Sequence, residues 1–280
     1  MNPISGGVDK SQLPSAIDTV IDESAYQCEI AYTQYGGHAT EISRQTDADI
    51  VVAVGGDGTV NEVASGMVGT DKILGIVPMG SGDGFARHLG LSHNVRKALG
   101  IINDGKYIKA DTGLINGKTF LCTCGVGLDA EVGYEFSKGK KRGLMQYVKI
   151  GVKTLLHYDP KAYSLEIDGK HYDETALLMT IGNANQWGNN AYVTPDASVE
   201  DGLFDITIAH GASIPGLAWL ACLLMTKRLK RSRNVTFKRA KEITIHNSSP
   251  IHAHYDGEPV AYSGDIKINI VPASLNVIVP

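Results

Sequence analysis

The sequence predicts two domains of different fold class, an N-terminal α/β domain with a parallel sheet and a C-terminal β-rich domain. In the first third, short apolar runs end in glycine-rich loops and are followed by helical patterns. After about Lys106 the pattern changes to alternating runs joined by Asn-Gly and Asp-Gly turns. A chain of 280 residues is long enough for two domains. We therefore assign residues 1–107 to the first domain and 108–280 to the second.

The first domain is expected to alternate strand, glycine loop and helix. Residues 49–56 (DIVVAVGG) are a continuous β-branched run, which is typical of a buried parallel strand. Residues 59–67 have a helical apolar face, and residues 73–80 (ILGIVPMG) form the next strand. Further helices are predicted from Phe85 and Asn94. This order places the loops at the carboxyl ends of the strands, where open α/β sheets bind ligands.

The second domain is expected to consist of short antiparallel strands. The dipeptides Asn116-Gly117 and Asp168-Gly169 separate alternating runs and predict hairpins. Helices are predicted near 143–157 and 215–228. Further alternating runs occupy residues 203–210, 240–247, 250–260 and 266–272.

Composition excludes several classes of protein. No stretch reaches the about 20 consecutive apolar residues that cross a bilayer, and the N-terminus lacks the pattern of a secretory signal. The four cysteines are too scattered for a disulfide framework, and Cys122 and Cys124 are expected to be half-buried on one face of a strand. A cytoplasmic location is therefore expected, and we expect no nucleic-acid partner.

Basic residues are segregated along the chain. More than half of the 26 Lys and Arg residues fall in segments 137–153 and 213–241, which contain no acidic residue. This distribution favours an anionic partner, either phosphate-bearing or lipidic. The alternative is a solvated basic face that acids elsewhere in the fold neutralise.

The loop GGDGTVN at Gly55–Asn61 is the first candidate site. It matches neither the GxxxxGK[ST] loop nor the dinucleotide GxGxxG pattern. Its glycines nevertheless allow backbone N–H groups to approach phosphates, and the following helix presents its positive end to them. Asp57 is placed to hold Mg²⁺ or its waters. The alternative is an ordinary Asp-Gly turn that joins strand to helix.

A second glycine loop, PMGSGDGFARHL, follows the next strand. Ser81 is expected to donate to a phosphate, and Asp83 to accept from ribose or purine. Two such loops at one sheet edge favour a nucleotide site over a plain turn.

The motifs together resemble those of a known family. NPISGG, GGDGTVNEV, PMGSGDGFAR, CGVGLDAEV, PDASVEDGLFDI and YDGEP occur in one order. The chain is similar to the diacylglycerol kinase catalytic-domain family, which includes bacterial lipid kinases and sphingosine and ceramide kinases. The resemblance implies a β-sandwich second domain, an active site in the interdomain cleft, and ATP- and Mg²⁺-dependent phosphorylation of a lipid hydroxyl. Which lipid is the acceptor stays open.

Two other functions are kept as alternatives. GGDGT is shared with NAD kinases and 6-phosphofructokinases, so an NAD kinase-like phosphotransferase is one of them. The GSGDGFAR loop and the late DGE motif argue for the lipid kinase instead. The other alternative is a catalytically silent nucleotide- or lipid-binding protein.

The resemblance also implies roles for individual residues. Asp57 and Asp129 would organise the catalytic magnesium through water, and Glu258 would be the general base. Asp201 would bind a second, structural Mg²⁺ with its side chain, and Ser198 and Leu203 with their carbonyl groups; oxygen ligands suit such a cation. The implied nucleotide-binding residues are Thr33, Gly55, Gly56, Asp57, Gly58, Thr59, Val60, Asn61, Glu62 and Ser81, to which the loop chemistry adds Asp83.

The sequence departs from the family pattern at two places. The commonest form of the second loop has Asn-Asp where this chain has Asp83-Gly84, and the GSG form is closer to the sphingosine-kinase branch. Asn2 follows Met1 directly, so the first strand that usually precedes the NPxSG turn is expected to be missing.

Residues 216–233 combine an apolar run with a basic cluster. A membrane-seeking segment is one interpretation, and a core helix over Leu217–Leu224 is the favoured one. In either case Lys227–Arg233 are expected to contact an anionic membrane, which would place the enzyme at the inner face of the membrane, beside its lipid substrate. A homodimer also stays open. His252 and His254, next to the DGE motif, are expected to fill a strand rather than line a cleft.

Overall fold

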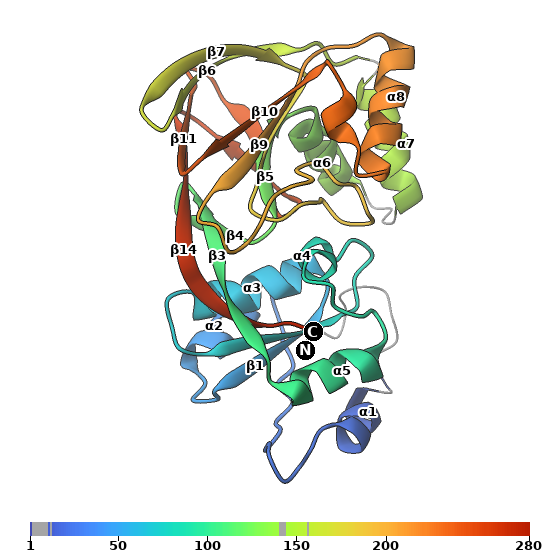
Figure 1. The fold of residues 1–280 in the computed structure, drawn as a ribbon, viewed down its shortest axis with the longest axis vertical. Helices are drawn as coiled ribbons and strands as arrows, with labels where there is room; N and C mark the ends of the chain where they lie inside the picture. The colour runs from blue at the N-terminus through green and yellow to red at the C-terminus, as the bar shows by residue number, and fades with distance from the viewer. Residues whose placement is uncertain (2–10, 12, 140–143, 156) are drawn as a thin grey trace. The chain divides into compact units, whose positions relative to one another are not determined.

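The computed structural model describes residues 1, 11, 13–139, 144–155 and 157–280 (Figure 1). The chain forms two compact units, Met1–Asp111 with Pro272–Pro280, and Thr112–Val271. The predicted boundary at 107/108 lies close to the first crossing between the units. The return of the last residues to the first unit was not anticipated, and it follows from the length of strand β14 (Ile266–Ile278), which runs through both units.

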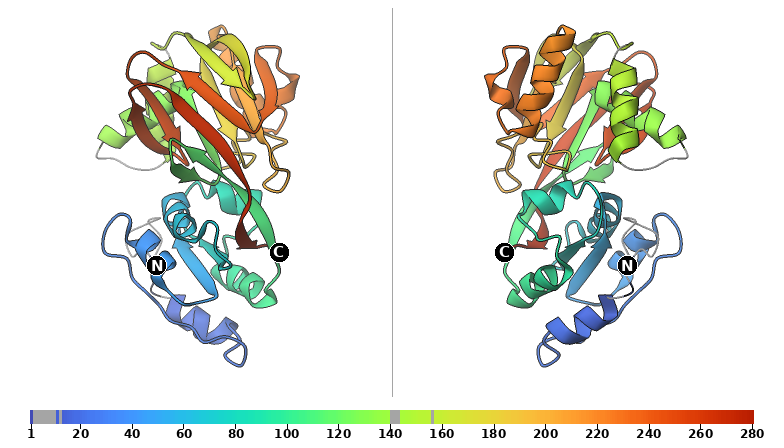
Figure 2. Two further views of the ribbon diagram at one scale, coloured as in Figure 1. Left: turned by 90° about the vertical axis from the view of Figure 1, so that its left-hand side faces the viewer. Right: turned by 90° about the vertical axis from the view of Figure 1, so that its right-hand side faces the viewer.

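The first unit is an α/β domain with a parallel sheet (Figure 2). Strands β1 (Ile50–Gly55) and β2 (Ile73–Pro78) pair in parallel, from Ile50 opposite Ile73 to Gly55 opposite Pro78. The end of β14 adds a further parallel strand beside β2. The helices of this unit are α1 (Leu13–Val20), α2 (His38–Gln45), α3 (Asp57–Met67), α4 (Gly84–His88) and α5 (Val95–Asp104).

Local sequence signals explain the packing of these helices. The Asn94 side chain caps α5 by accepting from the N–H of Lys97, and Gly105 ends the helix in the left-handed conformation, with φ 65°. Helices α2 and α3 approach closely at Gly66, where a Cβ would lie 2.1 Å from the Ser43 hydroxyl. A core of α1, α5, β1 and β2 residues fills one side of the sheet.

Among the described residues no strand precedes β1. The N-terminal amine of Met1 donates to the carbonyl of Ala31 at 2.7 Å, and its carbonyl accepts from Thr33 at 3.0 Å. The predicted NPxSG turn lies outside the described residues, as do Lys140, Lys141 and Arg142 of the first basic segment.

The second unit is a β-sandwich. One antiparallel sheet has the order β10-β9-β8-β5-β12-β13, and the facing sheet includes β14, β11, β6 and β7, with the β3–β4 hairpin. The strands are β3 (Tyr107–Ile115), β4 (Lys118–Phe120), β5 (Thr123–Gly127), β6 (Lys161–Ile167), β7 (Lys170–Ala176), β8 (Leu178–Gly182), β9 (Phe204–Ala209), β10 (Val235–Ala240), β11 (Glu242–His246), β12 (Ile251–Tyr255) and β13 (Glu258–Tyr262).

Side chains from both sheets form the core of the sandwich. Phe120 stacks on Phe204 with ring centroids 5.5 Å apart, and Ile181, Ile206 and Ile245 are fully buried around them. Burial of this apolar surface is the main force that stabilises the unit. The hairpins predicted at Asn116-Gly117 and Asp168-Gly169 are present, each with both turn residues at positive φ.

The described part of the second unit has three helices: α6 (Leu128–Lys138), α7 (Leu144–Leu155) and α8 (Ile214–Met225). Helix α6 packs on β5 and β12 and also contacts α7. Helix α8 packs near β9 and β10 together with the short 3₁₀ turn η1 (Leu229–Arg231) (Figure 1). The predicted fold class, an α/β domain and a β-rich sandwich, is therefore confirmed.

Candidate functional site

The two glycine loops lie side by side in the first unit. Each follows one of the paired parallel strands, and the N–H of Met79 donates to the carbonyl of Gly55 at 2.9 Å. Gly56 and Gly80 meet backbone to backbone, since a Cβ on Gly80 would lie 2.6 Å from the Gly56 Cα. The sequence needs glycine here because any side chain would separate the loops.

Two carboxylates hold the loops in place. The Asp57 Oδ1 accepts from the N–H of Gly84 at 2.7 Å. Asp83 is 2% exposed, adopts φ 47°, and accepts from the N–H of Gly80 with both oxygens, at 3.0 and 3.1 Å. His93 lies 3.2 Å from the same carboxylate. The predicted contact of Asp83 with ribose or purine stays a prediction, and in the structure its carboxylate shapes the loop.

Burial raises the pKa of Asp83, while His93 and the Gly80 N–H oppose that rise. Of the other predicted nucleotide residues, those from Asp57 to Glu62 lie in the first two turns of α3, where Thr59 and Val60 are buried. Helix α3 begins at Asp57, so its N-terminal N–H groups lie at the loop, where an anion is stabilised. Ser81 is exposed at the tip of the second loop. Thr33 lies in the segment that bonds to Met1.

A second set of polar residues surrounds Asp129 at the start of α6. Its Oδ2 accepts from the Thr180 hydroxyl at 3.0 Å and lies 3.0 Å from the His254 Nε2. Gly125 leaves room for this cluster, because a Cβ there would lie 3.1 Å from the Asp129 carboxylate. His254 is buried, and its Nδ1 has no partner among the described residues.

The neighbouring histidine has a similar partner. His252 lies 2.8 Å from the Glu131 carboxylate and stacks on Tyr134, with ring centroids 3.7 Å apart. The two histidines of β12 therefore both pair with acids of α6, which gives them a specific role that the sequence had not shown.

Glu258 is the exposed first residue of β13, directly after a tight hairpin. Asp256 and Gly257 form the turn at φ 45° and 82°. The Asp256 carboxylate fixes this hairpin to β5 by accepting from three consecutive N–H groups at 2.7, 2.8 and 3.1 Å; these belong to Leu121, Cys122 and Thr123. Sequence reasoning missed Asp256 as the residue that positions Glu258.

The predicted structural magnesium site has a basic side chain beside it. The Arg239 guanidinium contacts the Asp201 Oδ2, and its Nε lies 3.2 Å from the Asp205 Oδ2. The other Asp201 oxygen accepts from the N–H of Leu203 at 3.1 Å, and the Ser198 hydroxyl accepts from the N–H of Glu200. Each oxygen of Asp201 thus has one protein partner in this arrangement, and the roles of Asp201, Ser198 and Leu203 as magnesium ligands stay predictions.

Two further observations concern metal-binding side chains and the cysteines. Within the described ranges no cluster of three or more His, Cys, Asp or Glu side chains could hold a metal. Cys122 and Cys124 are fully buried rather than half-buried, and burial together with the charges of Asp256 and Asp129 raises the pKa of the Cys124 thiol well above its ordinary value. That thiol is therefore protonated and inert.

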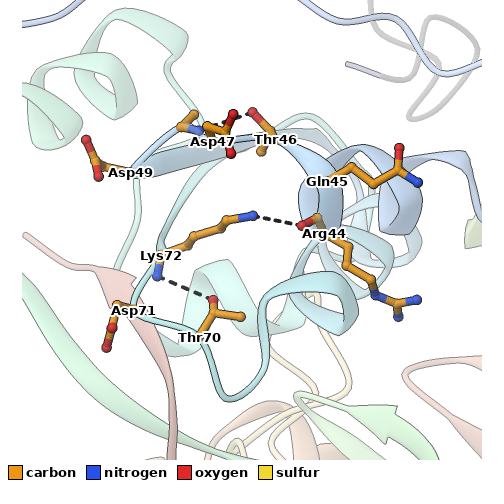
Figure 3. Close-up of a pocket in the computed structure, with 9 residues that line it drawn as sticks. Arg44, Gln45, Thr46, Asp47, Asp49, Thr70, Asp71 and Lys72 are labelled. Atoms are coloured by element: carbon orange, nitrogen blue, oxygen red, sulfur yellow. Dashed lines mark hydrogen bonds between the residues drawn. The ribbon is translucent and has the colours of Figure 1, made fainter.

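A pocket in the first unit lies at the opposite ends of β1 and β2 from the glycine loops (Figure 3). Its central side chain, Lys72, donates to the carbonyls of Ser43 and Arg44 at 2.9 and 3.0 Å, which satisfies the end of α2. These bonds give Lys72 a structural role, so we place no site in this pocket.

Comparison with known proteins decides the family. Residues 1–115 match the model of the diacylglycerol kinase catalytic domain, and residues 122–279 match the YegS C-terminal NAD kinase beta sandwich-like domain. This chain belongs to the diacylglycerol kinase family. The family predicted from the sequence motifs is therefore confirmed.

Relatives extend over most of the chain. A protein named diacylglycerol kinase from Staphylococcus carnosus is 29% identical over 278 residues, which cover 96% of this chain and 90% of that protein. A protein of the same name from Bacillus subtilis is 27% identical, and the match covers 92% of this chain and 88% of that protein. Both are bacterial proteins, and their names describe a kinase.

Solved structures show the same fold. The crystal structure of a diacylglycerol kinase from Bacillus anthracis superposes with a TM-score of 0.74 at 22% identity, covering 100% of this chain and 94% of that one. An NAD kinase from Archaeoglobus fulgidus in complex with ATP reaches a TM-score of 0.55 at 13% identity, covering 99% and 91%. Separately, no helix among the described residues is long and apolar enough to cross a membrane.

Proposed function

We propose that this family member is an ATP- and Mg²⁺-dependent lipid kinase that transfers the γ-phosphate of ATP to a hydroxyl of a diacylglycerol- or sphingosine-type lipid. The observation that carries the proposal is the pair of glycine loops at neighbouring strand ends, within residues that match the diacylglycerol kinase catalytic domain. The bacterial relatives named diacylglycerol kinase support this choice of acceptor.

The loops of the first unit are the proposed triphosphate site. The start of α3 offers N–H groups to phosphate oxygens, and the close backbone contact between Gly56 and Gly80 fixes the loop that leads into this helix. When bound, Mg²⁺ neutralises charge on the transferring phosphoryl group. Asp57 is the residue of this loop proposed to hold it through water, and Asp129 is the one proposed from the second unit.

Glu258 is proposed to accept the proton of the lipid hydroxyl. A general base must reach its proton in a fixed geometry. The hairpin that carries Glu258 is anchored through Asp256 to three backbone N–H groups, which supplies that rigidity. The phosphoryl group then passes to the hydroxyl oxygen, and ADP leaves.

Transfer of radiolabel from γ-labelled ATP tests the proposal. The protein is incubated with Mg²⁺, NAD⁺, and vesicles that contain diacylglycerol, monoacylglycerol, a sphingoid base and ceramide. Label in a lipid is expected. Label in the dinucleotide would instead favour an NAD kinase-like enzyme, and no label with ATP still bound would favour a silent binding protein.

A further inference from the structure

Helix α8 is apolar on the side that faces solvent. Its exposed surface carries Ile214 at 70% exposure, Trp219 at 58% and Met225 at 52%. Ala218, Ala221 and Cys222 are exposed between them, and no charged residue occurs in the helix. Surface helices of globular proteins normally present polar residues to water. The favoured prediction, an amphipathic core helix over Leu217–Leu224, describes only the inner face of α8, where Leu223 is buried.

The opposite side of α8 already has a packing partner. Leu220 and Leu224 pack with the buried Leu223 against a small cluster formed with Leu229 and Val235. Their spacing of three and four residues places them on one helix face. The fold therefore holds α8 by its inner face, and the outer apolar stripe contributes nothing to that packing.

A basic turn follows the helix directly. Lys227, Arg228, Arg231 and Arg233 are exposed, and none of them forms an ion pair with a described residue. Lys230 differs, because it contacts Asp196. Lys227 ends the helix at φ 57°, a position normally taken by glycine or asparagine. A lysine in this conformation is less favourable than a glycine would be.

We propose that the outer stripe of α8 and the basic turn 227–233 together form a docking surface for an anionic lipid bilayer. The helix would lie in the plane of the interface, with Ile214, Trp219 and Met225 in the acyl boundary and the basic turn among the headgroups. An apolar helix face with tryptophan beside basic residues is the composition that binds such interfaces. The inference rests on the proposed lipid-kinase function, because a lipid kinase must reach a substrate that lies in a membrane.

Charge favours a bilayer over a second copy of the chain. In a two-fold dimer the same patch meets itself, so a partner would add a second uncompensated basic turn to the surface. Anionic headgroups neutralise the turn instead, with about a fivefold gain in partitioning for each Lys or Arg near the surface. In a dimer through α8, the basic turn would thus remain without an anionic partner.

Vesicle flotation without ATP tests the docking surface directly. Wild-type protein is expected to float with vesicles of phosphatidylcholine and phosphatidylglycerol, and much less with phosphatidylcholine alone or at high salt. The double variant Arg228→Glu/Arg231→Glu is expected to bind at least about 25-fold more weakly. Lys118→Glu/Lys170→Glu, an equal charge change at two exposed hairpin positions of the same unit, is the matched control and is expected to bind like wild type.

Fluorescence locates the helix in the interface. The chain has two tryptophans, so Trp187→Phe leaves Trp219 as the single reporter. Its emission is expected to shift to the blue with phosphatidylglycerol vesicles. An unshifted emission together with unchanged flotation of the charge variant would overturn the proposal. So would a concentration-dependent dimer that Trp219→Ser abolishes, because a second copy would then cover the stripe.

Kinase assays separate this inference from the proposed function. With short-chain diacylglycerol dispersed in solution, the charge variant is expected to keep wild-type turnover, while it loses turnover on vesicles. If the wild type phosphorylates no lipid at all but still floats with anionic vesicles, the proposed function fails and the docking surface stands. Equal turnover of both proteins on vesicles would refute the docking role.

Discussion

Arg239→Gln removes the guanidinium that joins Asp201 and Asp205. The Asp205 side chain is 11% exposed and that of Arg239 46%, so the pair is only partly shielded from water. Loss of one member of a fully buried pair destabilises by about 3–5 kcal/mol, and partial exposure lowers the expected loss here to about 2 kcal/mol at neutral pH. For a protein of this size that corresponds to a fall in Tm of about 4–8 °C.

The expected pH dependence follows from Asp205. Burial raises its pKa above the ordinary value of 3.8, and Arg239 opposes that rise. Without Arg239 the pKa of Asp205 rises further. A carboxyl with a raised folded-state pKa binds protons more readily when folded, so stability falls as the pH rises through that pKa. The gap in Tm between wild type and variant is therefore expected to be largest at neutral pH and to shrink as the pH falls toward 4.

Thermal unfolding measured by circular dichroism, with and without Mg²⁺ and without nucleotide, is the assay. Wild-type Tm is expected to be insensitive to Mg²⁺, because Arg239 already neutralises Asp201. Lys241→Gln, an exposed basic residue nearby in the chain, is the control and is expected to change Tm little. A Tm loss that is equal at pH 5 and pH 7.5 would refute the electrostatic reasoning. Strong stabilisation of the wild type by Mg²⁺ alone would show that a metal displaces Arg239.

Three further substitutions test other parts of the structure. Gly80→Ala places a Cβ 2.4 Å from the Asp83 carboxylate, so we expect the unfolding free energy to fall by about 1–3 kcal/mol and ATP binding, measured by calorimetry, to be lost. The control is Gly100→Ala, in open space on α5, which should stabilise the protein slightly. Asp256→Asn keeps the turn conformation but weakens three charge-assisted hydrogen bonds. We expect the free energy of unfolding in denaturant to fall by about 2 kcal/mol and kcat to fall as well. An unchanged midpoint of denaturant unfolding would contradict this. Lys227→Gly should raise the unfolding free energy by about 1 kcal/mol by relieving the left-handed residue, and no gain would show that the residue is not strained.

The sequence was sufficient for the fold because its local signals agree with one another. Each predicted strand of the first domain ends at a glycine that the structure uses, as Gly56 and Gly80 show. The Asn-Gly and Asp-Gly turns gave the hairpins of the sandwich directly. The return of β14 to the first unit had no such signal, because the alternating pattern ends near Ile270 and Pro272 interrupts the run before the residues that pair with β2.

The site was only partly predictable, since its contacts join residues distant in sequence. Asp129 and His254 are 125 residues apart, and His252 and Glu131 are 121 apart, so alternation along β12 alone gave no sign of the acids opposite. Arg239 lies in a basic segment of the sequence, which predicted a solvent-exposed charge and gave no sign that Arg239 pairs with Asp201. For α8 the sequence left a membrane-seeking segment and a core helix both open, because composition does not distinguish a buried apolar helix from one that faces solvent.

The measurement that tests the central claim most directly is label transfer from γ-labelled ATP to diacylglycerol vesicles by wild type and by Glu258→Gln. Glu258 is exposed at the end of its hairpin, so the substitution should leave folding and ATP affinity unchanged. We predict labelled lipid with wild type, and a rate about 10²–10⁴-fold lower with the variant. Wild-type protein that binds ATP and labels no lipid, or a variant as fast as wild type, would contradict the account.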